Sequence, residues 1–531
     1  MAKRTPAARP RHREVGGAPD VIRRRRGSKF TRATFVTMST PGCYFDAAST
    51  EPLHPAAREV LLSAIDDGWA DPARLYRESR QARMLLDRAR EIVAEQIGAR
   101  PDETSFTASG TAAIHLGGLG ALRAGRRRGR HVVLSAVEHS AVFEAARFGT
   151  ASASGVPPSS AASSSDDGDA VRPVGVDVLG RLDVEEFVAA AAAPGVALAC
   201  LQSANHEVGT RQPVAAVVAA LSAAVRSHGV RPVPLLVDAA QSLGRDSVPG
   251  GWQLLTASAH KWGGPAGVGV LAVRRGTRFE VAGPTDHRDL GGLPGVEVGM
   301  PNLPGILAAA AALSARVDER TELATRDRAW TSELRGRFAT LPDAQVVGDP
   351  DDRLPHLMTV SFFGVDGETL VTELDRAGLS VSSGSSCTSS TLEPSHVLVA
   401  MGVLTHGNVR ISLHRNSTRG DVDRLLTVLP DVVARVRAEH DAIMGRRAGR
   451  FTSLADGGRV LDCRGMPCPA PVIEMAKAIR DVGVGDEIAV DADDPAAPGD
   501  VAAFTRMRGH AFVGSVIQPD GAARITVRRL I

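Results

Sequence analysis

The fold is decided by the stretch Leu235-Leu-Val-Asp238-Ala-Ala-Gln241, a short apolar run that ends in a carboxylate. It belongs to one of four short apolar runs, at 131–134, 196–201, 233–237 and 268–273, and Ala/Leu-rich stretches with helical periodicity separate these runs. This alternation predicts crossover units around a largely parallel sheet, from about residue 44 to 439. The sequence therefore predicts an α/β fold for most of the chain.

Composition excludes several classes of protein. The chain has 531 residues, of which 43% are hydrophobic, enough for several buried cores. No apolar stretch reaches the roughly 20 uninterrupted residues of a membrane span, so no membrane segment is expected. The five cysteines are an odd and sparse set, which argues against a disulfide framework and favours a reducing, cytoplasmic location.

Charge is distributed unevenly. Residues 1–37 hold 11 of the 62 basic residues and 2 of the 60 acidic ones, and they show no apolar periodicity. We interpret them as a disordered basic tail. The remainder is net acidic by seven charges, so direct nucleic-acid binding is not expected.

Changes in composition divide the chain into domains. Residues 38–440 form the main domain, in which the Ser-, Ala- and Gly-rich segment 151–170 is predicted to be an exposed insertion. Residues 441–458 are predicted to be a linker. A second small domain follows at 459–531, with strands predicted at 459–462, 487–491 and 523–530 and a helix at 471–481.

Two residues at predicted strand ends suggest a cofactor. Lys261, in Ser258-Ala-His260-Lys261, follows Asp238 by 23 residues. A lysine amine can form a Schiff base with a flat carbonyl cofactor, and a carboxylate keeps the ring nitrogen of pyridoxal phosphate protonated. Taken singly, the lysine could be a solvated charge and the aspartate a helix cap.

Further candidate contacts lie upstream. Ser109-Gly110-Thr111 precedes a helix and offers hydroxyl and backbone N–H groups to a phosphate. His139 follows a predicted strand, where its imidazole could stack on a ring or could be an ordinary loop histidine.

Two cysteines lie in segments suited to reactivity. Cys387 is flanked by serine, glycine and threonine in Val381-Ser-Ser-Gly-Ser-Ser-Cys387-Thr-Ser-Ser, which favours a mobile thiol over a buried one. Cys468 precedes a predicted helix, whose dipole lowers a thiol pKa. Its spacing from Cys463 does not suit a zinc hairpin, so no metal is expected, and Cys43, Cys200 and Cys463 are predicted to be structural.

Residues 44–437 resemble the group I cysteine desulfurases of the class V, fold-type I aminotransferases, most specifically around Cys387 and in Leu392-Glu-Pro-Ser. The resemblance implies a pyridoxal phosphate (PLP) fold-type I large domain with a mainly parallel sheet and a small α+β domain. Residues 459–531 resemble the TusA/SirA-like sulfur carriers, through Cys468-Pro-Ala-Pro471. That resemblance implies a small two-layer α/β domain.

The resemblance implies a role for each candidate. Lys261 would bind the cofactor and move the α-proton, Asp238 would pair with the ring nitrogen, His139 would stack on the ring, and Arg410 would grip the substrate carboxylate. The other implied cofactor contacts are Gly110, Thr111, His206, Gln241, Ser258 and His260. Cys387 would take sulfur from L-cysteine as a persulfide, leaving alanine, and Cys468 would carry it onward. The family also implies a homodimer and sulfur-acceptor proteins as partners.

The sequence departs from the family pattern at three places, the first of which is Ala70-Asp-Pro-Ala-Arg-Leu-Tyr76 in place of the usual Gly-Asn-Pro-Ser-Ser-x-His. His206 stands where a second asparagine is usual, and Glu297-Val-Gly-Met300 replaces the Arg-Ser-Gly-Thr that a neighbouring subunit normally offers to the phosphate. Two other hypotheses therefore stay open. One is a selenocysteine lyase or another PLP-dependent β-eliminating enzyme, and the other is a non-catalytic sulfur-carrier scaffold.

Overall fold

The computed structural model describes residues 42–154, 170–228, 232–285, 288–383, 394–444, 450–453, 459–466 and 469–531. Three predictions fall outside these residues: the basic tail at 1–37, most of the insertion at 151–170, and the two candidate sulfur-carrying cysteines themselves, Cys387 and Cys468. The prediction of an exposed segment is wrong at both of its ends, because Ala151 belongs to a helix and is buried and Ala170 is also buried.

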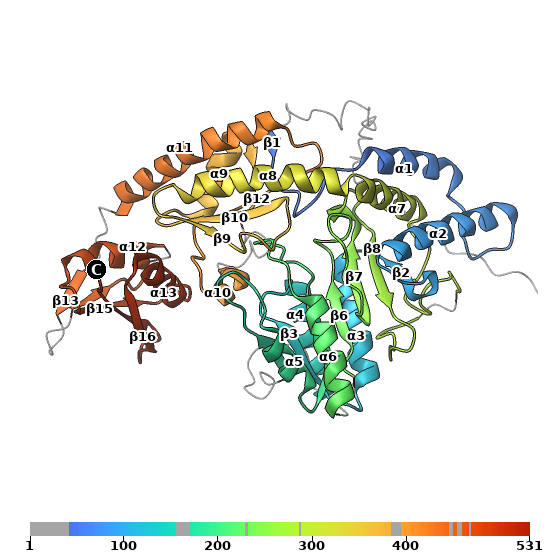
Figure 1. Ribbon diagram of the computed structural model, residues 1–531, viewed down its shortest axis with the longest axis horizontal. Helices are drawn as coiled ribbons and strands as arrows, with labels where there is room; N and C mark the ends of the chain where they lie inside the picture. Colours follow the sequence, from blue (N-terminus) through green and yellow to red (C-terminus); the bar gives the residue numbers. More distant parts are fainter. Residues whose placement is uncertain are drawn as a thin grey trace, which may run out of the picture. The chain divides into compact units, whose positions relative to one another are not determined.

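A seven-stranded sheet forms the centre of the main domain (Figure 1). Its spatial order is β2-β8-β7-β6-β5-β3-β4. The strands are β2 (Thr104–Thr107), β3 (His131–Ser135), β4 (Val171–Val174), β5 (Val196–Cys200), β6 (Leu235–Asp238), β7 (Leu254–Ser258) and β8 (Gly269–Val273). Strands β4, β3, β5, β6 and β7 run parallel, and β8 runs in the opposite direction between β7 and β2, so both of its pairings are antiparallel. The predicted parallel sheet is confirmed.

Both faces of this sheet are buried, which explains why its strands read as continuous apolar runs. Alternate residues of β6 enter different cores: Leu235 and Val237 join one cluster, and Leu236 joins the other. The first cluster includes residues of α2 (Arg77–Gln96), α5 (Val184–Ala192), α6 (Val214–His228) and α7 (Leu303–Asp318). The second includes residues of α3 (Gly110–Gly125) and α4 (Ser140–Ser154). Helix α1 (Pro55–Asp67) packs on α7.

A smaller α+β unit completes the main domain. Its antiparallel sheet has the order β12-β10-β9, from β9 (Ala344–Val347), β10 (Leu357–Phe362) and β12 (Asn408–Ser412). Helices α8 (Arg320–Ala339), α9 (Gly367–Arg376) and α11 (Arg419–Met444) contribute to its core. A short parallel pair, β1 (Cys43–Tyr44) and β11 (Leu379–Ser380), lies beside them, and α10 (His396–Met401) precedes β12.

The C-terminal domain has its own five-stranded sheet and core. The strands β13 (Arg450–Ser453), β14 (Arg459–Asp462), β15 (Glu487–Ala492), β17 (Ala523–Arg528) and β16 (Ala511–Ile517) are in that spatial order. Helices α12 (Ala470–Ala478) and α13 (Ala497–Arg508) contribute to its core. Here the sequence predicted three of the strands and α12, but it missed β13, β16 and α13.

The segment predicted as a linker is partly structured. Helix α11 continues into it as far as Met444, and β13 pairs antiparallel with β14. Only residues 445–449 separate α11 from β13. Cys200 and Cys463 are buried, as predicted for structural thiols, and burial raises the pKa of Cys463 to about 12. No helix in the described part of the chain is long and apolar enough to cross a membrane.

Candidate active site

The candidate residues gather at one edge of the central sheet. Strands β3, β5, β6 and β7 are parallel, so their carboxyl ends meet at the same edge, where open α/β sheets bind ligands. His139 follows β3, His206 follows β5, Asp238 ends β6, and Lys261 lies one short turn after β7. The rings of His139 and His206 are 5.2 Å apart between centroids. Residues up to 122 positions apart therefore meet because the strand order brings them together.

Lys261 and Gln241 share one backbone acceptor. The carbonyl oxygen of Ala48 accepts a hydrogen bond from Lys261 Nζ and another, of 2.9 Å, from Gln241 Nε2. The other side-chain atom of Gln241, Oε1, is buried and has no hydrogen-bond partner among the described residues. Sequence reasoning missed Ala48, because a backbone carbonyl leaves no signature in the side-chain pattern.

Asp238 is buried, with 8% of its surface exposed. Its Oδ1 accepts hydrogen bonds from Ala240 N (3.0 Å) and Thr256 Oγ1 (3.3 Å). Burial raises the pKa of Asp238 to about 6, so the carboxylate is still ionised at neutral pH. A buried carboxylate is stabilised by a cationic partner, and a protonated pyridine nitrogen is such a partner.

The residues predicted to bind a phosphate also lie together. Gly110 is the first residue of α3, and the preceding residue, Ser109, caps the helix by accepting a hydrogen bond from Ala112 N. A Cβ atom on Gly110 would lie 2.8 Å from Ser258 Cβ, so the helix start and the end of β7 touch only because residue 110 is glycine. Ser258 Oγ is 3.1 Å from His260 Nδ1, and Thr111 is exposed. Hydroxyls at a helix N-terminus, a buried acid and an amine together fit a planar cofactor that carries a phosphate.

The close approach of Gly110 to Ser258 predicts that a methyl group added at residue 110 destabilises the protein. Gly110→Ala should lower the free energy of unfolding by about 1–3 kcal/mol and weaken binding of the phosphate group, because α3 must move away from β7. Gly118→Ala, in the same helix, is the matched control. The added Cβ would lie 3.5 Å from Ala145 Cβ, which is an ordinary contact. The free energy of unfolding of this variant should therefore equal that of the wild type or exceed it by about 0.5–1 kcal/mol. Urea unfolding midpoints of both variants measure the difference, and equal midpoints would contradict this geometry.

The two neighbouring histidines are neutral at pH 7. Burial, assisted by the nearby Lys261, lowers the pKa of His139 to about 4, and its Nδ1 accepts a hydrogen bond of 3.1 Å from Ala141 N. Burial also holds the pKa of His206 well below its ordinary value. His206 Nδ1 is buried without a hydrogen-bond partner in the described residues, so it is available to a bound group. A neutral imidazole can stack on a ring or donate one hydrogen bond.

Arg410 lies on β12 and reaches the site from the smaller unit. Its Nη2 donates to Asp46 Oδ1 (2.8 Å) and Ser49 Oγ (2.6 Å), and its Nη1 donates to the carbonyl of His206 (3.0 Å). Its Nε is buried without a partner among the described atoms. The guanidinium is therefore fixed in place before any substrate binds. Sequence reasoning missed Asp46 and Ser49, which lie more than 360 residues away from Arg410 along the chain.

Two buried glutamates lie next in sequence to the two site histidines: Glu138 precedes His139, and Glu207 follows His206. Burial raises the pKa of Glu138 to about 8, and Glu138 Oε1 accepts a hydrogen bond of 2.7 Å from Gln202 N. Burial raises the pKa of Glu207 to about 7, opposed by a hydrogen bond of 2.6 Å from Ser395 Oγ. Glu138 is therefore predominantly protonated at neutral pH, which avoids a second negative charge near Asp238.

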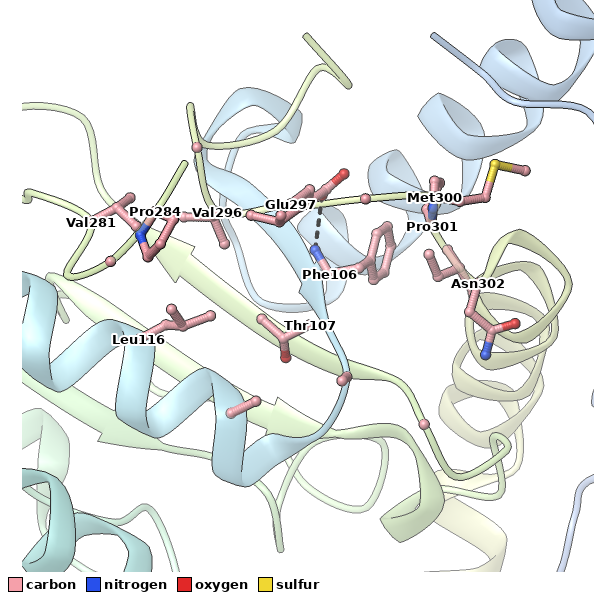
Figure 2. Close-up of a pocket in the computed structure, with 18 of the residues that line it drawn as sticks. Phe106, Thr107, Leu116, Val281, Pro284, Val296, Glu297, Met300, Pro301 and Asn302 are labelled. Carbon is pink, nitrogen blue, oxygen red and sulfur yellow. Dashed lines mark hydrogen bonds between the residues drawn. The ribbon is translucent and has the colours of Figure 1, made fainter. Parts of the chain in front are cut away.

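Glu297, which departs from the family pattern, is engaged within its own chain. Both carboxylate oxygens accept hydrogen bonds of 3.0 Å from Arg90 Nη2, and Oε1 also accepts one of 2.9 Å from Phe106 N. Figure 2 shows the contact with Phe106 at the wall of a pocket of about 490 Å³, between β2 and the segment that precedes α7. Glu297 thus holds its segment against β2, while Val298 and Met300 stay exposed.

The use of lysine singles out residue 261. Of the 62 basic residues in the chain, only four are lysines, at positions 3, 29, 261 and 477. The chain therefore relies on arginine wherever a positive charge is sufficient. A lysine in the buried site indicates chemistry that needs an amine, since guanidinium stays protonated. This signal was present in the sequence.

Comparisons with known proteins agree with this geometry. Residues 43–425 match the aminotransferase class-V family, and residues 459–529 match the sulfurtransferase TusA family. The chain is 37% identical over 407 residues to a cysteine desulfurase of Cereibacter sphaeroides, covering 74% of this chain and 96% of the relative. It is 31% identical to cysteine desulfurase IscS 1 of Archaeoglobus fulgidus, covering 74% and 98%. A solved NifS-like protein aligns with a TM-score of 0.64 at 27% identity, covering 74% of this chain and all of that one.

Proposed function

Because the chain belongs to the class-V aminotransferase family, as a PLP-dependent cysteine desulfurase joined to a TusA domain, we propose that it moves sulfur from L-cysteine through Cys387 to Cys468. The observation that carries this proposal is the convergence of Lys261 and Asp238 at one sheet edge, in a chain that also has a sulfurtransferase domain. We refer to residues 459–531 as the carrier domain and to residues 42–440 as the desulfurase domain.

PLP, when bound, supplies a ring that withdraws electrons from the Cα of the amino acid substrate. Lys261 is the amine that holds the cofactor and moves the substrate's α-proton, and Asp238 keeps the ring nitrogen protonated. His139 would stack on the ring as a neutral imidazole, and Arg410 would bind the substrate carboxylate through its guanidinium group. The fixed contacts of Arg410 with Asp46 and Ser49 support this role, since a held guanidinium loses little freedom on binding.

The sulfur steps balance without an external oxidant. The Cys387 thiolate attacks the substrate sulfur, a new S–S bond forms as the Cβ–S bond breaks, and the substrate carbon gains a proton to give alanine. The Cys468 thiolate then attacks the terminal sulfur of that persulfide, and Cys387 leaves as a thiolate. An acceptor protein or small thiol finally removes the sulfur from Cys468.

Persulfide mapping tests the proposal directly. With L-cysteine labelled in its sulfur, we expect label on Cys387 first and on Cys468 later, together with one alanine for each sulfur. Cys387→Ser should lose both labels, whereas Cys468→Ser should keep the first. Label on Cys468 in the Cys387→Ser chain would overturn the order. Unchanged cysteine turnover in that chain would favour a β-eliminating enzyme instead.

The pKa of Asp238 predicts a pH dependence of cofactor binding. Burial raises this pKa to about 6, so the carboxylate is ionised above that pH and becomes protonated below it. Because only the ionised form pairs with a protonated ring, the dissociation constant of PLP should rise up to about tenfold per pH unit below pH 6. Fluorescence titration of the apoprotein measures this constant. Asp238→Asn is the control, because the phosphate of the cofactor still titrates while residue 238 does not. This variant should bind PLP weakly, and its dissociation constant should depend less on pH.

We propose that the protein acts as a homodimer, as its family implies. The exposed Val298 and Met300, beside the pocket at Glu297, support an apolar contact there between two copies. Sedimentation of the holoprotein tests this, and a monomer at micromolar concentration would overturn it.

A further inference from the structure

A buried carboxylate of the carrier domain takes its partners from the desulfurase domain. Asp500, in the first turn of α13, has 2% of its surface exposed. Its Oδ1 accepts hydrogen bonds of 2.9 Å from both the backbone N and the Oγ1 of Thr405. Its Oδ2 lies 2.9 Å from His406 Nε2. Burial opposes a charge on His406, but contact with Asp500 leaves the pKa of His406 above its ordinary value.

Two arginines of α13 extend these polar contacts. Arg506 donates to the carbonyl of Gly402, and Arg508 forms an ion pair with Asp343. Among the described residues, Asp343 is the one non-glycine residue with positive φ, at 55°. Aspartate adopts this left-handed conformation more readily than most residues.

An aromatic contact lies among these polar pairs. Phe363 of the desulfurase domain stacks on Phe504 of α13, with ring centroids 5.2 Å apart and planes at 27°. Phe363 packs against the carrier core itself. The neighbouring Gly364 would bring a Cβ within 3.9 Å of Ile473 on α12. An apolar centre with a polar, ion-paired rim is the usual composition of a specific interface.

We infer that Asp500 and α13 dock the carrier domain onto its own desulfurase domain, at the segment 402–406, and that sulfur transfer between the two domains uses this docked state. Separation would remove the partners of Asp500 and expose Phe363 and Phe504 to water. The five residues 445–449 span at most about 18 Å, so the carrier stays near this surface at high effective concentration.

The docking segment is connected to the active site by one short helix. Helix α10 ends at Met401, just before the docking segment, and begins at His396. His396 Nε2 lies 2.8 Å from the carbonyl of Glu138, and its ring is 6.5 Å from that of His206. Six helical residues span about 9 Å, so the dock and the site lie at opposite ends of the same helix.

Hydrogen exchange in the full chain tests the docking. The amide of Thr405 donates to Asp500, so Asp500→Ala should raise exchange in the peptide 402–406 by about tenfold or more. Thr405→Val changes the desulfurase domain instead. It keeps the hydrogen bond from the backbone N of residue 405 to Asp500 but removes the one from the hydroxyl, so it should raise hydrogen exchange in α13 while the carrier sequence stays intact. Glu487→Gln is the matched control, because this carrier glutamate pairs with Arg528 inside its own domain. Unchanged exchange in both test variants would overturn the docking.

A second measurement tests the use of the docked state, which rests on the proposed function. With dithiothreitol as acceptor, Asp500→Ala should form alanine within twofold of the wild-type rate. Labelling of Cys468 in a single turnover should slow by about tenfold or more. Normal labelling despite faster exchange would overturn the role of docking in transfer. If the wild-type chain formed no alanine, the proposed function would fail, while the exchange result would still decide the docking.

Discussion

Replacing Lys261 by alanine should lower the rate of alanine formation from L-cysteine by about 10³-fold or more. The variant loses both the amine that holds the cofactor and the base that moves the substrate's α-proton, and general acid–base catalysis alone contributes about 10²–10⁴-fold. No other lysine in the described residues can substitute, since the remaining one, Lys477, lies on α12 of the carrier domain. Alanine is measured by chromatography with dithiothreitol as the sulfur acceptor.

The control for this prediction is Lys477→Ala, which removes an exposed amine that pairs with Glu474 on α12 of the carrier domain. Its alanine rate should match that of the wild type. Borohydride reduction of the holoprotein provides a second readout, because it should fix the cofactor mass on the peptide that contains Lys261. Cofactor mass on any other peptide, or a Lys261→Ala chain that keeps a tenth of its activity, would contradict the assignment.

Replacing Glu297 by alanine should destabilise the desulfurase domain by about 3 kcal/mol, since the buried guanidinium of Arg90 loses its buried carboxylate partner and keeps only the half-exposed Asp87 as a counter-charge. The Arg90 and Glu297 side chains are 1% and 6% exposed. Arg90 would keep its hydrogen bonds to the carbonyl of Thr104 and to Asp87. The backbone N–H of Phe106 would lose its acceptor. Urea unfolding followed by tryptophan fluorescence measures this, because Trp252 and Trp262 are buried in the same domain.

An exposed ion pair of the same domain provides the comparison. Glu280 pairs with Arg123 and Arg126, and all three side chains are more than 40% exposed. Exposed pairs contribute little, so Glu280→Ala should leave the unfolding midpoint nearly unchanged. A Glu297→Ala chain as stable as Glu280→Ala would mean that the segment at Glu297 is not held by this pair.

Local sequence was sufficient for the central sheet and for the candidate residues at its edge. The predicted runs at 131–134 and 268–273 lie within the observed β3 and β8 or one residue beyond them, since strands buried on both faces keep an uninterrupted apolar pattern. Asp238 and Lys261 could be proposed because they follow two such runs. The roles of these residues in catalysis stay predictions.

Contacts between distant residues could not be predicted. The acceptor at Ala48, the acid at Asp46 beside Arg410, and the pair of Arg90 with Glu297 each join parts of the chain separated by about 190 residues or more. In the carrier domain, α13 has little difference between its faces because it is buried on several sides, so helical periodicity did not reveal it. In the sequence, Asp500 resembles any acidic residue near the start of a helix. Only the fold shows that it contacts Thr405 and His406.

The strand β13 also decides which strand borders the carrier sheet. It pairs with the outer side of β14, so β13 is the border on that side and β14 lies inside the sheet. The opposite border, β16, is open and presents four exposed apolar side chains, Phe512, Val513, Val516 and Ile517. A fragment begun at residue 459 would lack β13, so the backbone of β14 would lose its pairing on that side and become a new border, which can template association between copies. Anyone producing the carrier domain alone should therefore begin upstream of Arg450 to keep it monodisperse.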